Sequence, residues 1–311
     1  MAGDPGRSGP VVSERQPANL LVAHQASQPL PTRCSNQLAV ISTVLAAFAA
    51  SAGLIVTGLY HDAPNWVQQA RGTDFATLFI AVPVLLVALW TARRGFAAGR
   101  LAVIAGLLYL VCNYAIFAFS VAMNPLTAVH FAIFGVSLWS LVLGARIAVD
   151  DSQAATDRLN RRASAALLIG VAGMFGLLWL GQIATTTMTG TLAPDLVRAG
   201  ISTNPVYALD LAFFLPLCAV AGIGLLRRNG AAADALPMLI WVPLMGAGVL
   251  GGFVLAAAAG DEVPIVVASV IGALCVASAS LAVVAIVRPS PHVVDLTHRA
   301  GGETRPAHLG G

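Results

Sequence analysis

Three polar residues with helical spacing open the sixth apolar segment of this 311-residue chain: Asn204, Tyr207 and Asp210. Three-residue steps place them on roughly one face of a helix, with Asp210 about 9 Å below Asn204 at 1.5 Å per residue. A charge at the bilayer centre costs about 2.5–3.5 kcal/mol on insertion scales, so such a residue normally faces protein or water and has a partner. The spacing therefore predicts a polar site in which Asp210 titrates or binds a solute.

Polar side chains of the neighbouring apolar segments fall at the same expected depth. Arg71 and Asp74 precede the second segment, so we expect them at the mouth of the site, with Arg71 neutralising Asp210 or binding an anion. The pocket would be built from segments three to six and open on the side where segment six begins. The predicted ligand-binding residues are Asp210, Arg71, Tyr207, Asn204, Asn113, Tyr114, Gln182, His130 and Asp74.

Each of these residues also has a purely structural interpretation. A buried aspartate can sit in a fixed ion pair or hydrogen bond, and amide and hydroxyl side chains often join transmembrane helices. His130 fits a packing role near the interface as well as a proton relay. Neither His61 nor His130 has a second histidine four residues away, so we predict no metal and no cofactor.

The composition places the chain among membrane proteins. Hydrophobic residues make up 58% and charged residues 10%, and the mean hydropathy is +0.82. A soluble domain has about 25% charged residues. The net charge of +3 comes from arginines at segment boundaries rather than on one face, which excludes a nucleic-acid partner. Four cysteines without a CxxC pair predict neither a disulfide framework nor a zinc site.

Eight apolar runs are each close to the ~20 residues that cross a bilayer. Because backbone groups cannot stay unpaired in lipid, each run must be a helix. The predicted fold is an all-α polytopic bundle over residues 36–288, between disordered tails at 1–35 and 289–311. The predicted spans are about 37–59, 75–92, 101–120, 126–147, 163–186, 205–226, 236–258 and 265–287.

Arginine distribution predicts the orientation. Fifteen of the seventeen basic residues fall in the tails and in the turns on one side, and only Arg71 and Arg198 fall on the other. Positive loops stay in the cytoplasm, so both termini are expected there.

Local signals predict several features of the segments. Residues 62–71 suggest a short helix over the mouth of the pocket, with Asp62 as its N-cap and Gly72 as its stop. Pro83 and Pro216 should kink spans two and six. Because apolar runs around these two prolines look alike and both end in an arginine pair, a parallel 4+4 repeat is a further possibility.

Two glycine motifs lie in the seventh segment. Gly248 and Gly252, four residues apart, predict close helix packing. The run 246–251 also matches GxGxxG, but it lies mid-span with no preceding strand, so the dinucleotide-binding interpretation fails.

Four stretches resemble a group of uncharacterised multi-pass membrane proteins, mostly from actinobacteria. They are residues 58–60, 69–74, 113–120 and 203–216. The resemblance covers the eight-segment core and implies a bacterial cytoplasmic membrane. It brings no assigned activity and no catalytic residues.

Three functional hypotheses remain open at this point. The favoured one is an extracytoplasmic pocket that binds a small polar or anionic solute or a proton, in transport or sensing. A membrane-embedded enzyme acting on a lipid-type substrate would need a nucleophile or metal beside an acid–base pair. A non-catalytic subunit of a larger complex would need neither. The lipid bilayer is the one partner predicted, and the sequence leaves the oligomeric state open.

Overall fold

The structure is a computed structural model that describes residues 30–144 and 156–287. Within these ranges it is all-helical, and eight helices are long and apolar enough to cross a membrane. This confirms the predicted eight-span helical fold. The predicted tails fall largely outside the described residues, except that the first helix already begins at Leu30.

The eight spans form two sets of four in chain order. The first set contains α2 (Leu30–Ile55), a second span made of α3 (Pro64–Ala76), η1 (Thr77–Ala81) and α4 (Val82–Arg93), then α5 (Ala97–Ser120) and α6 (Thr127–Gly144). The second set contains α8 (Arg161–Thr189), a sixth span made of α10 (Pro205–Leu209), η3 (Asp210–Phe214) and α11 (Leu215–Arg227), then α12 (Ala235–Ala258) and α13 (Ile265–Val287). Two short helices, α9 (Pro194–Ala199) and η4 (Gly230–Asp234), connect spans.

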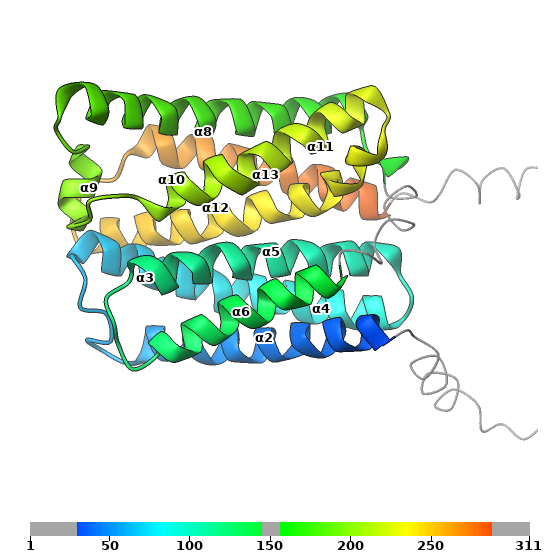
Figure 1. Ribbon diagram of the computed structural model, residues 1–311, viewed down its shortest axis with the longest axis horizontal. Coiled ribbons are helices and arrows are strands. Elements are labelled where there is room, and N and C mark those ends of the chain that lie inside the picture. The colour runs from blue at the N-terminus through cyan, green and yellow to red at the C-terminus, as the bar shows by residue number, and fades with distance from the viewer. Residues whose placement is uncertain (1–29, 145–155, 288–311) are drawn as a thin grey trace, which may run out of the picture.

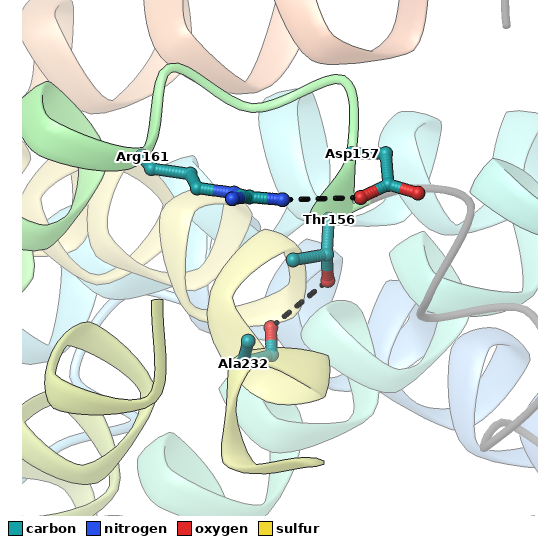
Figure 2. Close-up of polar contacts among 4 residues, drawn as sticks. All are labelled: Thr156, Asp157, Arg161 and Ala232. Atoms are coloured by element: carbon teal, nitrogen blue, oxygen red, sulfur yellow. Dashed lines mark hydrogen bonds and ion pairs between the residues drawn. The ribbon is translucent and has the colours of Figure 1, made fainter. Parts of the chain in front are cut away.

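The spans lie side by side, so the bundle has two ends (Figure 1). The Tyr60 end, at the left of Figure 1, is formed by the connections 56–63, 121–126, 190–204 and 259–264. The Arg93 end is the opposite one, where α2 begins and α13 ends. There, Thr156 donates to the carbonyl of Ala232 and Arg161 pairs with Asp157, which links the start of α8 to η4 (Figure 2).

Helix α12 joins the two sets. It packs on α13 and, across the bundle, on α3 and α5. In the first set α6 packs on α2 and α5, and in the second set α8 packs on α11. Large apolar side chains remain exposed around the bundle, among them Phe79, Leu177 and Val266. This exposure suits a lipid-facing surface.

Glycines form the crossing of α3 and α12. A Cβ added to Gly72 would overlap the backbone of Gly251 and Gly252. One added to Gly252 would overlap the side chain of Gln69, and one on Gly248 would lie 3.3 Å from Thr73 Oγ1. The predicted close packing at Gly248 and Gly252 is confirmed, and the GxGxxG match lies inside α12 as expected.

The predicted stop at Gly72 is wrong. Helix α3 runs without interruption from Pro64 into η1, and its N-cap residue is Ala63 rather than Asp62. Gly72 serves the close approach to α12, which is a packing requirement that the sequence pattern cannot separate from a helix end. Asp62 instead accepts a hydrogen bond from the backbone N–H of Ala122, at 2.9 Å, and ties two connections together.

Both internal prolines of spans two and six follow a π-helical turn. The turn Thr77–Ala81 ends two residues before Pro83, and Asp210–Phe214 ends two residues before Pro216. A proline removes one backbone donor and clashes with the preceding turn, and a wider turn relieves that clash. Single π-helical turns of this kind are frequent at functional sites.

Candidate functional site

Asp210 is the first residue of η3, and its half-buried side chain faces α8. Its Oδ2 accepts a hydrogen bond of 2.8 Å from Trp179 Nε1 on α8. The Trp179 ring also stacks on Tyr207, with centroids 4.5 Å apart. Span six therefore brings Tyr207 and Asp210 to the same indole, as their three-residue spacing predicts.

Arg71 does not neutralise Asp210. Its Nη2 donates to the carbonyl of Leu54, at 3.1 Å, in the last turn of α2. The last carbonyls of a helix lack intrahelical partners, and arginine is a favourable residue to satisfy them. Arg71 is thus occupied at the end of α2, and the hydrogen-bond partner of Asp210 is an uncharged indole.

Asp74 belongs to a second, drier cluster. Its side chain is 2% exposed, and its Oδ2 accepts a 2.6 Å hydrogen bond from the Tyr60 hydroxyl. A Cβ on Gly53 would overlap both the carboxyl group and that hydroxyl, so the pair is held directly against the backbone of α2. Burial and then the Asp74 charge raise the pKa of Tyr60 well above its ordinary value, which keeps the phenol protonated as the donor.

Tyr114 and His130 lie in an aromatic cluster around Phe117. The ring centroid of Phe117 is 4.9 Å from that of His130, 5.6 Å from that of Tyr114 and 6.0 Å from that of Tyr60. The Tyr114 hydroxyl donates to the carbonyl of Ala46, at 3.4 Å. His130 is 1% exposed and its Nε2 is buried without a hydrogen-bond partner among the described residues, which matches the packing interpretation better than a solute-binding one.

The remaining predicted residues separate. Asn113 is buried and donates to the carbonyl of Tyr109 and to Met245 Sδ, so it joins α5 to α12. Gln182 is half-buried on α8 and has no hydrogen-bond partner in the described part of the chain. Asn204 caps α10 by accepting a hydrogen bond from the backbone N–H of Val206, with 2.9 Å between Oδ1 and the nitrogen.

A cavity of about 770 Å³ lies at the Tyr60 end, between α3, α9, the end of α12 and the connection 261–264. Asn204 is the one predicted site residue that lines it, so this cavity does not coincide with the pocket expected between spans three to six. Polar and charged residues of the lining are Gln68, Gln69, Arg198, Asn204, Asp261 and Glu262.

The structure thus divides seven of the nine predicted residues among three places, and the other two, Asn113 and Gln182, lie apart from these on α5 and α8. Asp210 and Tyr207 share the indole of Trp179, and Asn204 lies above them at the cavity. Asp74, Arg71, Tyr114 and His130 belong to the buried surroundings of α2, α5 and α6. The described residues contain no group of three or more His, Cys, Asp or Glu side chains able to hold a metal ion.

Two partners that decide this arrangement were not among the predicted residues. Trp179 lies three residues before Gln182 on α8, and therefore on nearly the same helix face. Tyr60 lies in the first connection, where sequence alone does not show which way a side chain turns. Trp179 could have been predicted as the partner of Asp210, because an intramembrane aspartate needs a donor and an indole N–H lies on the preceding span.

Comparisons with protein-family models, characterised proteins and solved structures give no match to this chain. The resemblance to actinobacterial membrane proteins therefore stays a prediction.

Proposed function

We propose that this protein is a solute-binding membrane protein of the transport or sensing type, whose solute enters through the cavity at the Tyr60 end. One observation carries the proposal. Asn204 lines the cavity, and six residues further along the same span the half-buried Asp210 holds a single neutral donor, Trp179. A membrane carboxylate that is neither sealed nor ion-paired among the described residues is suited to bind a proton or a cationic group.

The orientation follows from charge. Nine arginines of the described residues lie at the Arg93 end, and Arg71 and Arg198 lie at the Tyr60 end. By the positive-inside rule the cavity faces the outside of a bacterial cell membrane and both termini are cytoplasmic.

The two π-helical turns support a 4+4 repeat. Each begins six residues before a proline, and the residue at that place is Thr77 in the first set and Asp210 in the second. Both side chains bond an aromatic partner on a neighbouring helix, Tyr109 and Trp179 respectively. A transporter built from two such halves would change conformation at the glycine crossing of α3 and α12, at the base of the cavity.

The test is water access to position 210 in whole cells. In a background that keeps the buried Cys112 and Cys218 and replaces Cys34 and Cys275 by serine, Asn204→Cys and Asp210→Cys should react with a membrane-impermeant maleimide added outside. Only a hydrated thiol that can ionise reacts at a useful rate. Phe213→Cys is the matched control, because Phe213 belongs to the same π-helical turn but is 65% exposed on the apolar surface.

We expect Asp210→Cys to react at least several-fold faster than Phe213→Cys. Equal, negligible labelling of the two would remove the aqueous path to Asp210 and, with it, the proposed function. Labelling of Asn204→Cys only after permeabilisation would reverse the orientation. Phe96→Cys, in the turn at the Arg93 end and 59% exposed, supplies the complementary control because it should label only in permeabilised cells.

A further inference from the structure

The cavity at the Tyr60 end carries charges of both signs, and these define a class of solute. Arg198 reaches it from α9, and Asp261 and Glu262 reach it from the connection between α12 and α13. All three side chains are exposed. Over the described residues, Arg198 has no ion pair with either carboxylate, so the cavity presents separate positive and negative groups.

Each charged group has a preferred ligand. A guanidinium is matched to a carboxylate, which it can bind through two parallel hydrogen bonds. A pair of carboxylates attracts an ammonium group, and an aromatic face within the same cavity adds a favourable surface for it. Trp66 and Phe253 provide such faces in the lining.

Singly charged solutes fit less well. A simple anion attracted to Arg198 would be repelled by Asp261 and Glu262, whereas a simple cation attracted to these carboxylates would be repelled by Arg198. A molecule with one carboxylate and one ammonium group meets an opposite charge at both ends. Part of the acidic side is already engaged, because Gln68 donates to Asp261 Oδ2 at 2.6 Å, which leaves Glu262 as the freer carboxylate.

We infer that the cavity binds a small zwitterion, with its carboxylate on Arg198 and its ammonium group on the side of Glu262 and Asp261. This rests on the proposed function for the biological use of the site, and it narrows the solute to a zwitterion. The cavity volume of about 770 Å³ admits an apolar body between the two charged groups.

Binding to the purified full-length protein by calorimetry tests the class with two matched sets of probes. The first set is glycine betaine, choline, which lacks the carboxylate, and 3,3-dimethylbutyrate, which lacks the positive charge. The second set is L-phenylalanine, phenethylamine and 3-phenylpropionate. We expect at least one zwitterion to bind more tightly than both of its singly charged analogues.

Two variants assign the ends of the solute. Arg198→Gln should weaken binding of the zwitterion by about tenfold or more, the usual effect of losing a charge-assisted hydrogen bond. It should strengthen the cationic analogue, because it removes a charge that repels a cation. Glu262→Gln should weaken the zwitterion and strengthen the anionic analogue, because it removes a charge that repels an anion on Arg198. Arg228→Gln, in the turn after α11 at the opposite end, is a control that should change neither.

Three outcomes would overturn the inference: an anion that binds as tightly as its zwitterion, a cation that does so, or no binding by any of the six probes. These three binding results are independent of the maleimide labelling at position 210. Aqueous labelling of Asp210→Cys with no zwitterion binding would leave the proposed function and remove this solute class. Zwitterion binding without aqueous labelling of Asp210→Cys would keep this solute class and remove the proposed function.

Discussion

Asp74 and Asp210 are both aspartates inside membrane spans, yet their surroundings differ. Asp74 is 2% exposed, is bonded to Tyr60 and lies against the α2 backbone at Gly53. Asp210 is half-buried, is bonded to Trp179 and lies six residues along span six from Asn204, which lines the cavity. The first carboxyl group is enclosed by backbone and by a phenol whose hydroxyl stays protonated, whereas the second is half-buried beside a neutral indole.

This difference indicates two roles for an aspartate inside a membrane span, one in stabilising the fold and one in binding. An enclosed carboxyl group with a fixed donor holds α2, the first connection and α3 together, since removing any member leaves a buried polar group unpaired. A half-buried carboxyl group contributes less to folding because solvent or solute can replace its partner. The comparison predicts that changes around Asp74 act on stability and that changes around Asp210 act on binding.

The largest expected effect is that of Gly53→Leu. The new side chain would occupy the place of the Asp74 carboxyl group and the Tyr60 hydroxyl. Overpacking and the loss of the buried hydrogen bond together should cost more than about 3 kcal/mol. The yield of inserted, monodisperse protein and its thermal unfolding in detergent measure the loss.

Gly170→Leu is the matched control for this change. Gly170 is an exposed helical glycine of α8 where an added Cβ meets nothing within 4 Å. It should unfold like the parent protein. If Gly53→Leu were as stable as Gly170→Leu, Asp74 would not be held against α2.

Tyr60→Phe comes next. It removes the donor to Asp74 and keeps the ring contact with Phe117, so the expected cost is about 1–3 kcal/mol, the penalty of an unsatisfied buried group. A thiol-reactive dye can follow unfolding through the buried Cys112 and Cys218, in the background that lacks Cys34 and Cys275.

A double-mutant cycle makes the result specific. Asp74→Leu with Tyr60→Phe replaces both partners by apolar groups and should recover part of the loss, because neither polar group is then left unpaired. Strictly additive effects of the two substitutions would show that the 2.6 Å hydrogen bond does not couple them.

Much of the fold could be predicted from the sequence because the bilayer restricts it so strongly. Eight apolar runs require eight helices, and glycines four residues apart in the seventh run predict a close crossing. The prolines at 83 and 216 marked the two irregular turns. Chain direction then fixed which polar residues share an end of the bundle, as for Asn204, Tyr207 and Asp210.

The pairing of side chains across helices could not be predicted. Depth alone cannot show that Arg71 turns toward the end of α2, or that His130 turns into the rings of Tyr114 and Phe117, because both depend on helix rotation. Gly72 had two physical interpretations, a helix stop and a close contact, and only the neighbouring α12 decides between them. The step from one helix to the next therefore needs the structure, because the sequence does not give the rotation of each helix.

The smallest effect on stability should come from Trp179→Phe, the counterpart of Tyr60→Phe in the second half. Phenylalanine keeps a ring to stack on Tyr207 but removes the N–H that bonds Asp210. Because Asp210 is half-buried, water from the cavity side can replace the lost donor, and we expect a cost below about 1 kcal/mol in the same dye assay. A cost equal to that of Tyr60→Phe would mean that Asp210 is as enclosed as Asp74, and the distinction between a structural and a ligand-binding aspartate would no longer hold.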